Sequence, residues 1–200
     1  MGRQASKVFL IVLLVVVLVL LGAAGWLYWR AREALPQYAG EVRVSGLEHP
    51  VTVLRDARAV PHLYAESLAD LLFAQGYVTA QERLWQMDTL RRMARGELAE
   101  IFGRRMLALD KENRILGLGG VAERAAELLD TQSRAQFEAY ARGVNAFIET
   151  HRNHLPLEFL LLGYTPRPWT PSDTLAVGLN MFKLLSTTWP WELLRAKVLE

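Results

Sequence analysis

RDARAVPHLYAESLADLLFAQGYVTAQERLWQMDTLRRMARGELAEIFG, residues 55–103, contains the longest amphipathic run of the sequence. Its apolar side chains recur every three or four positions, at Phe73, Tyr77, Ala80, Leu84, Met87, Leu90, Ala94, Leu98 and Ile101. That spacing is the period of one face of an α-helix. The stretch therefore predicts a long amphipathic helix whose apolar stripe, Leu84 and Met87 included, faces the core.

Polar residues and glycines mark the start and the irregular points of this predicted helix. Ser67 precedes it, and a serine hydroxyl there can accept a hydrogen bond from a free backbone N–H of the first turn. The Asp70 carboxylate favours the positive end of the helix dipole. Gly76 and Gly96 interrupt the pattern, so we expect a kink or a close contact with another helix near either glycine.

Composition limits the class of protein. The chain has 200 residues, enough for a domain with a real core. Three basic residues and no acidic ones lie in the first 30, and the rest carries 20 basic against 21 acidic residues. No basic stripe with stacking aromatic residues occurs, so we expect no nucleic-acid partner. The absence of cysteine excludes thiolate catalysis and thiolate metal sites from these residues, and it suits an oxidising compartment.

The N-terminus predicts one membrane-spanning helix. Residues 8–29 contain no charge, and 22 helical residues span about 33 Å, enough for a bilayer core. Trp26, Tyr28 and Trp29 predict an interfacial belt, and Arg3 and Lys7 with the terminal amine predict a basic inner flank. We assign residues 1–30 to a membrane anchor and 31–39 to a linker, with the following domain outside the cytoplasm. The small residues at 22–25 leave a cleaved signal peptide as the alternative.

Residues 40–200 predict an α+β segment that is mostly helical. Residues 41–44 and 51–54 read as two short strands joined by a turn. Helices are expected at 121–129, 133–151, 172–186 and 189–200, with Ser172 and Asp173 at the start of the third. We expect a glycine loop at 117–120 and an ordered, proline-rich loop at 155–171. The last helical pattern continues to residue 200, which indicates a fragment or one subunit of a longer protein.

Several separated motifs carry a resemblance to a known family. They are RD at 55–56, VPHLYA at 60–65, FAQGYV at 73–78, AQ at 80–81, RL at 83–84, QMD at 86–88, ARG at 94–96, YARGVNA at 140–146 and GYTP at 163–166, followed by Trp169, Pro171 and Asp173. In this order they resemble the penicillin acylase family of N-terminal nucleophile hydrolases over roughly residues 50–195.

The resemblance implies a fold, an activity and a partner. Residues 40–200 would be the incomplete α-subunit part of an αββα sandwich, with the C-terminal β-subunit of the same precursor as partner. The whole enzyme would hydrolyse the amide between an acyl group and an amine through an acyl-serine. Family substrates include β-lactams and acyl-homoserine lactones, and the sequence does not choose between these acyl-amides.

The resemblance also implies that the catalytic residues lie outside this chain. In the family the nucleophile is a serine, usually followed by asparagine, whose own α-amine acts as the base after self-cleavage. The six serines here are Ser6, Ser45, Ser67, Ser133, Ser172 and Ser186, and none is followed by asparagine. We therefore assign no catalytic residue and expect these residues alone to be inactive.

Four residues are candidates for substrate and metal contacts, each through the resemblance. Phe182 takes the place of a methionine in the acyl pocket of penicillin G enzymes, Leu185 that of an arginine and Ser186 that of a phenylalanine. These departures put phenylacetyl specificity in question. Glu192 falls on a calcium-binding glutamate of the family, so structural calcium is expected and no organic cofactor. The alternatives are core packing for Phe182 and a surface carboxylate for Glu192.

The remaining polar residues favour structural roles. His62, in a predicted loop, could act as a general base, but the favoured role is a hydrogen bond between its ring and the backbone. His151 and His154 are spaced for a solvated helix end rather than a metal pair. Asn145 favours a buried polar contact. Asp88 can pair with Arg91 or Arg92 at spacings of three and four, so the cluster of Arg91, Arg92 and Arg95 favours an ion-paired helix face.

A different class of protein stays open: a membrane-tethered helical scaffold without catalysis, derived from the family. A serine, threonine or cysteine after a spacer, beyond residue 200, would decide for the enzyme.

Overall fold

The computed structural model describes residues 2–186 and 189–199. Met1, with the terminal amine of the expected basic flank, and Glu200, the end of the last expected helix, lie outside these ranges. The elements in chain order are α1 (Gly2–Glu33), β1 (Thr52–Arg55), β2 (Pro61–Tyr64), α2 (Leu68–Arg95), α3 (Ala99–Phe102), the 3₁₀ turn η1 (Arg104–Met106), α4 (Leu107–Leu116), α5 (Leu118–Glu127), α6 (Thr131–Thr150), α7 (Leu157–Leu162), α8 (Pro171–Leu185) and α9 (Trp189–Leu199). The expectation of a mostly helical segment is confirmed.

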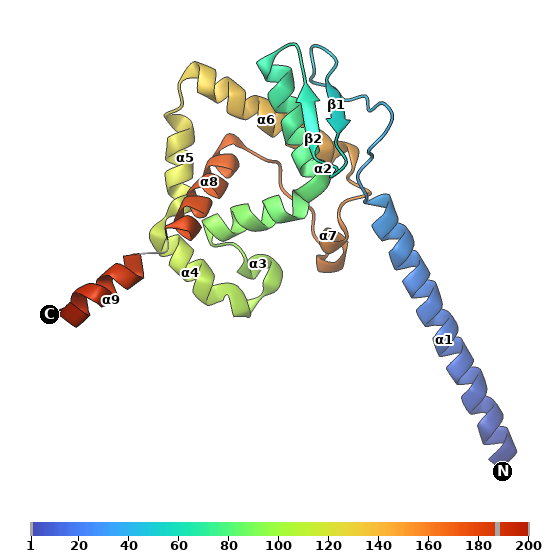
Figure 1. The fold of residues 1–200 in the computed structure, drawn as a ribbon. Helices are drawn as coiled ribbons and strands as arrows, with labels where there is room; N and C mark the ends of the chain where they lie inside the picture. The colour runs from blue at the N-terminus through green and yellow to red at the C-terminus, as the bar shows by residue number, and fades with distance from the viewer. Residues whose placement is uncertain (1, 187–188, 200) are drawn as a thin grey trace.

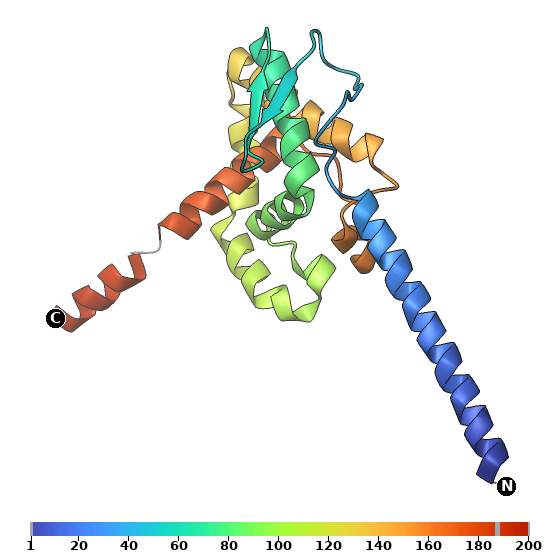
Figure 2. The same ribbon diagram turned by 45° about the vertical axis from the view of Figure 1, so that its right-hand side comes forward.

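Helix α1 extends away from the body formed by the other helices (Figures 1 and 2). Its apolar side chains between Val8 and Leu21 are exposed. In the part of the chain that the structure describes, α1 is the one helix that could cross a membrane, judged by length and composition only. A signal sequence passes the same test, so this geometry leaves both interpretations of the N-terminus open.

The strand prediction is half right. β1 pairs antiparallel with β2, in the register Thr52–Tyr64, Val53–Leu63, Leu54–His62 and Arg55–Pro61. The predicted strand at 41–44 is irregular, and the expected Pro61–His62 loop is instead the start of β2. The strand 52–55 therefore pairs with the segment that follows it, 61–64, and not with the predicted strand that precedes it, 41–44.

A carboxylate explains why the hairpin closes after β1. Asp56 Oδ1 accepts hydrogen bonds from the backbone N–H groups of Arg58 (2.8 Å) and Val60 (2.9 Å). These bonds reverse the chain within four residues, with Ala59 in the left-handed region at φ 61°. These two backbone hydrogen bonds are also the main reason that the pKa of the Asp56 carboxyl is lowered.

Helix α2 begins as expected but does not run straight. The Ser67 side chain accepts from the Asp70 N–H at the N-cap. Arg83 has non-helical angles (φ −148°, ψ 32°), and the helix changes direction there (Figure 1). Gly96, in the left-handed conformation at φ 67°, ends the helix rather than kinking it, so Ile101 belongs to α3.

The predicted apolar stripe nevertheless faces the core on both sides of the bend. The buried members are Phe73, Tyr77, Ala80, Leu84, Met87, Ala94 and Leu98. Leu90 and Ile101 are half-buried. The stripe packs against α6 through Ala141, Val144, Phe147 and Ile148, together with Phe159 and Trp169.

Two glycines allow α2 and α6 to pack backbone to backbone. A Cβ at Gly76 would overlap the carbonyl oxygen of Tyr140, and one at Gly143 would overlap that of Phe73. The expected close helix contact at Gly76 is therefore confirmed. Each glycine faces the backbone of the other helix, so the pair sets the separation of the two longest core helices.

Two expected loops are partly helical. Only Gly117 of the 117–120 run is a loop residue, at φ 69°, and α5 begins at Leu118. Within the expected loop at 155–171, Leu157–Leu162 forms α7, because the prolines leave six consecutive non-proline residues between Pro156 and the left-handed Gly163. Helices α6, α8 and α9 begin and end close to the predicted limits, whereas α4 was not predicted.

Candidate functional site

Helix α8 carries the predicted substrate-binding residues, and its first turn is fixed by a reciprocal cap. The Asp173 carboxylate accepts from the N–H of Thr170 (3.0 Å), while the Thr170 side chain accepts from the backbone of Asp173. Pro171 occupies the first helical position, where its missing N–H costs nothing. The cap therefore starts two residues before the predicted Ser172–Asp173 pair.

Asp173 also ties α8 to α2. It is fully buried and lies 3.2 Å from Arg91 Nη1 and 3.1 Å from Arg95 Nε. Arg91 in turn donates to the backbone carbonyls of Arg167 and Pro168 just before α8. A buried carboxylate with two guanidinium partners holds the start of α8 in place.

A second buried carboxylate, Asp88, completes the network from within α2. It accepts from Arg91 Nε (2.8 Å), Arg92 Nε (2.9 Å) and Tyr164 Oη (2.8 Å). Burial would raise the pKa of the Asp88 carboxyl, but the charge of Arg91 and these hydrogen bonds outweigh it and lower the pKa. Burial and the same carboxylate raise the pKa of Tyr164, which stays protonated. The arginine cluster is ion-paired, as expected, and Arg91 and Arg92 are buried within it.

The other end of α8 has one packed side and one open side. On the packed side, buried Asn180 donates to Met93 Sδ (3.6 Å), and Lys183 Nζ donates to Asn113 Oδ1 (2.7 Å) and to Glu112 (2.9 Å). These contacts with α2 and α4 fix the rotation of the helix. The opposite side of the helix is consequently directed away from the core.

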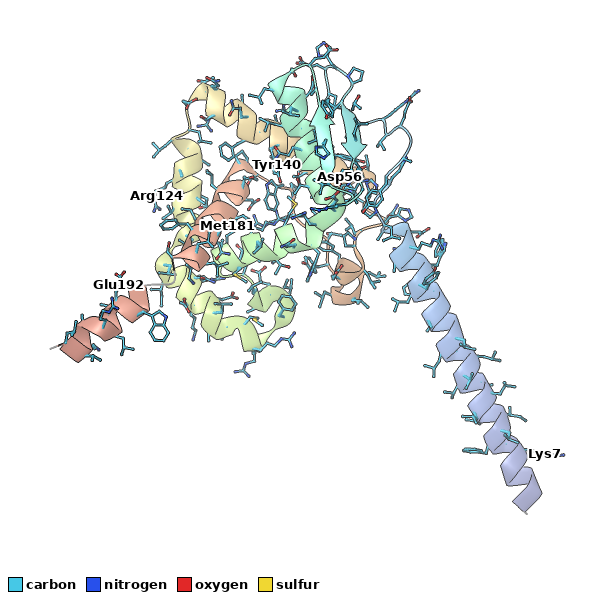
Figure 3. The ribbon with its side chains drawn as sticks, in the orientation of Figure 1. Lys7, Asp56, Arg124, Tyr140, Met181 and Glu192 are labelled. Carbon is cyan, nitrogen blue, oxygen red and sulfur yellow. The ribbon has the colours of Figure 1, made fainter. Side chains whose placement is uncertain are left out.

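The predicted substrate-binding residues lie on that open side. Phe182 is 70% exposed and Leu185 is 77% exposed, with Met181 (labelled in Figure 3) and Leu184 also exposed. Ser186 caps the helix, and its N–H donates to the Phe182 carbonyl (2.9 Å). Ser186 follows the last helical residue and its side chain is half-buried, so its sharing a helix face with Phe182 stays a prediction. Core packing, the alternative for Phe182, is not what the described residues show.

Glu192 lies on α9, beyond the end of α8, and its side chain is exposed (Figure 3). Among the described residues no three His, Cys, Asp or Glu side chains come together as a possible metal site. A calcium ion takes six to eight oxygen ligands, and one carboxylate supplies at most two. Glu192 therefore fits calcium only as one ligand among others from outside this chain.

Of the remaining candidates, Asn145 has the buried polar contact that the sequence favours, whereas the histidines have contacts that the sequence did not predict. Asn145 exchanges two hydrogen bonds with the backbone of Trp169, at 2.6 and 2.9 Å. His62 lies in β2, 3.6 Å from Asp56. His151 stacks on Phe147 with ring centroids 4.2 Å apart, and His154 pairs with Glu33 of α1 at 3.2 Å.

A cavity beside the first half of α2 is not predicted by any pattern in the sequence. A cavity of about 630 Å³ lies between the extended segment 37–53 and α2, with Tyr38, Val42, Val53, Phe73 and Tyr77 among its walls. Sequence periodicity cannot find it because the segment that covers it is irregular. None of the residues predicted to bind substrate or metal lines this cavity.

Comparisons with known proteins agree on one family. A family model for penicillin amidase matches residues 50–200. The chain is 39% identical to penicillin acylase 2 proenzyme of Pseudomonas sp. (strain SE83) over 158 residues, 79% of this chain and 20% of that protein. It is 38% identical to acyl-homoserine lactone acylase QuiP of Pseudomonas aeruginosa over 161 residues, 79% of this chain and 19% of that protein.

Solved structures give the same result. A thermostable penicillin G acylase from Alcaligenes faecalis superimposes with a TM-score of 0.60 and 32% identity, covering 66% of this chain and 71% of that chain. The chain spans about a fifth of the length of the curated relatives it matches.

Proposed function

Because the chain belongs to the penicillin amidase family, we propose that it is the N-terminal, α-subunit part of an amidohydrolase. The catalytic residues of the proposed enzyme lie in polypeptide outside these 200 residues, in the C-terminal β-subunit part of the same precursor. The complete enzyme would have the αββα sandwich of N-terminal nucleophile hydrolases, with the β1–β2 hairpin joining one of its sheets.

The proposed reaction is hydrolysis of an amide between an acyl group and an amine. The hydroxyl of a serine that begins the second polypeptide attacks the carbonyl carbon, and its own α-amine takes up the hydroxyl proton. The substrate amine leaves with a proton, and water then hydrolyses the acyl-serine ester to release the acid. The residues described above contribute a wall of the acyl pocket and the scaffold beneath it.

The observation that carries this proposal is the C-terminal end of α8, which has one side packed on the domain and one exposed apolar side. Lys183 and Asn180 hold one side against α2 and α4, while Phe182 and Leu185 present apolar surface that is exposed among the residues that the structure describes. An exposed apolar patch on a rigid helix is typical of an interaction or ligand surface. In the proposed enzyme the second polypeptide and the acyl group cover it.

The pocket residues favour an acyl group other than phenylacetyl. The small Ser186 and the planar Phe182 would leave a different space from the phenylalanine and methionine that they replace. We propose a longer aliphatic acyl group, on a β-lactam or homoserine-lactone amine. Relatives named as penicillin acylases and acyl-homoserine lactone acylases support both amines equally.

The full-length protein assayed on a panel of acyl-amides tests this proposal. We expect the highest kcat/KM on a medium or long aliphatic chain, and we expect Ser186→Phe to shift the preference toward shorter or aromatic acyl groups. Phe182→Met should alter the same ranking, whereas Phe137→Met, the same change on α6, should leave it unchanged. Best activity on phenylacetyl amides that Ser186→Phe does not alter would contradict the proposed pocket.

We further propose that α1 anchors the protein in the inner membrane, with the catalytic part facing the periplasm or the cell exterior. The charge-free apolar stretch of α1 at residues 8–29 and its exposed Trp26, Tyr28 and Trp29 support this location. Structural calcium, with Glu192 as one ligand, would link the two polypeptides of the mature enzyme. Calcium holds no catalytic role in this proposal.

A further inference from the structure

Helix α7 presents an apolar surface that the fold does not use. Leu161 is 67% exposed, and Leu160 and Leu162 are each 40% exposed. The helix is nevertheless held firmly, because Phe159 is buried and meets Trp85 and Tyr164 edge-on, with ring centroids 5.3 and 5.2 Å apart. The three leucines therefore form a fixed outward surface, which we call the α7 leucine patch.

The α7 leucine patch lies beside the point where α1 meets the domain. Arg30 Nη2 donates to the carbonyl oxygen of Asn153 (2.9 Å), and Glu33 lies 3.2 Å from His154 Nδ1, which joins α1 to the loop before α7. A hollow of about 340 Å³ is lined by Arg30 and Leu160, among others. Figures 1 and 2 place α7 next to the C-terminal end of α1, on the side toward which α1 extends.

The same end of α1 carries the residues that mark a membrane interface. Trp26, Tyr28 and Trp29 are exposed immediately before Arg30, and Trp and Tyr concentrate at the depth of the lipid headgroups. At 1.5 Å per helical residue, Arg30 lies only a few ångströms along the axis from Trp29. The leucine that shares a hollow with Arg30 is therefore near that depth as well.

Charge on this side also suits a lipid surface. Arg32 and Arg152 are exposed here, and long arginine side chains at the end of a span reach the level of the lipid headgroups. The exposed acidic group of α7 is Glu158, in its first turn, and the leucines follow it. Leucine side chains flanked by arginines match the boundary between headgroups and acyl chains.

From these positions we infer that the α7 leucine patch rests in the headgroup region of the bilayer around α1. The domain then contacts the membrane at two points, α1 and α7, which fixes its orientation on the lipid surface. This inference rests on the proposed membrane anchor. The second polypeptide of the proposed enzyme is the competing occupant of the patch.

Site-specific fluorescence in nanodiscs containing anionic phospholipid tests the inference on the full-length protein. These 200 residues contain no cysteine, so an environment-sensitive label can be placed at Leu161→Cys once any cysteine beyond them is replaced by serine. Leu18→Cys reports the anchor itself. Leu128→Cys, 84% exposed at the turn between α5 and α6, is the matched control on the opposite side of the domain.

We expect a quencher carried near the lipid headgroup to quench the Leu161 label severalfold more than the Leu128 label, and aqueous iodide to show the reverse order. A Leu18 label quenched from deep in the bilayer, with Leu161 behaving like Leu128, would overturn the contact and leave the anchor intact. A Leu161 label shielded from both quenchers would show that protein covers the patch, which also overturns the inference. A Leu18 label outside the lipid would remove the anchor and the contact together.

Discussion

Tyr164 donates a 2.8 Å hydrogen bond from its Oη to Oδ2 of Asp88, across 76 positions of sequence. The bond joins the loop between α7 and α8 to the buried side of α2. Through Arg91, the same carboxylate is connected to Asp173 and thus to the helix that carries the proposed pocket wall. The geometry of that wall therefore depends on a charge network inside the domain.

Replacing Asp88 with asparagine tests the importance of this network for stability. The variant removes the carboxylate that Arg91 and Arg92 share and leaves them only Asp173 and Glu100, so we expect the free energy of unfolding to fall by about 3–5 kcal/mol. Tyr164→Phe removes one hydrogen bond to a charged group and should cost about 1.5–3 kcal/mol. Chemical denaturation of the intact protein measures both.

Glu149→Gln is the control for these variants, because Glu149 forms an exposed ion pair with Arg152 at 3.6 Å. It should change the free energy of unfolding by no more than about 0.5 kcal/mol. A loss for Asp88→Asn as small as the loss for this control would show that the buried network does not stabilise the domain.

Acid should weaken the same network. The pKa of Asp88 is lowered in the folded protein, so its contribution to stability is present above its ordinary value of 3.8 and is lost as the pH falls through the lowered pKa. Tyr164→Phe removes one cause of the lowering, so in that variant the acid-dependent loss of stability should be smaller and should end at a higher pH. Unfolding free energies between about pH 6 and pH 3 measure this. Identical pH profiles for parent and Tyr164→Phe would contradict the assignment.

Replacing glycine with alanine should lower the free energy of unfolding where α2 meets α6 and raise it on the exposed side of α8. Gly76→Ala and Gly143→Ala force a Cβ against the backbone of the facing helix, so each should cost at least about 1–3 kcal/mol. Gly178→Ala, on the exposed side of α8 with no atom within 4 Å, should stabilise the protein by up to about 1 kcal/mol. Thermal unfolding compares the three. A stabilising effect at Gly76 would mean that α2 and α6 are not in backbone contact.

Local patterns in the sequence were enough to predict the longer helices, but not α4 or α7. The period from Phe73 to Leu98, the cap at Ser67 and the pairing of Asp88 with its neighbouring arginines all follow from spacing within one turn. The close contact at Gly76 was expected, but its partner Gly143 was not, because the pairing joins residues far apart in the chain.

The differences arise where distant contacts or single side chains decide the structure. Asp56 folds the hairpin onto residues 61–64 rather than onto 41–44, and no alternation pattern reveals such a turn. The bend at Arg83 interrupts no apolar period, since Ala80, Leu84 and Met87 all remain buried. Of the site, the sequence placed Phe182 and Leu185 on the last predicted helix but one, whereas the anchoring of α8 through Asp173 and Arg91 required the tertiary structure.

Replacing Glu192 distinguishes two possible roles of its carboxylate at the start of α9. If it is a calcium ligand shared with a second polypeptide, Glu192→Ala in the full-length protein should impair maturation and abolish stabilisation by calcium. If it only interacts with the helix dipole, the effect should stay below about 1 kcal/mol. Melting temperatures with calcium and with chelator distinguish these results, and Glu138→Ala, an exposed glutamate on α6, is the matched control. Normal maturation and an unchanged calcium response would remove Glu192 from the site.

Mass spectrometry of the mature full-length protein tests most directly whether this chain is part of an N-terminal nucleophile amidohydrolase. We predict two polypeptides, the second beginning with serine, threonine or cysteine, and a covalent acyl adduct on that first residue after reaction with an acylating inhibitor. A single uncleaved polypeptide that forms no adduct would contradict the account and favour a membrane-tethered scaffold without catalysis.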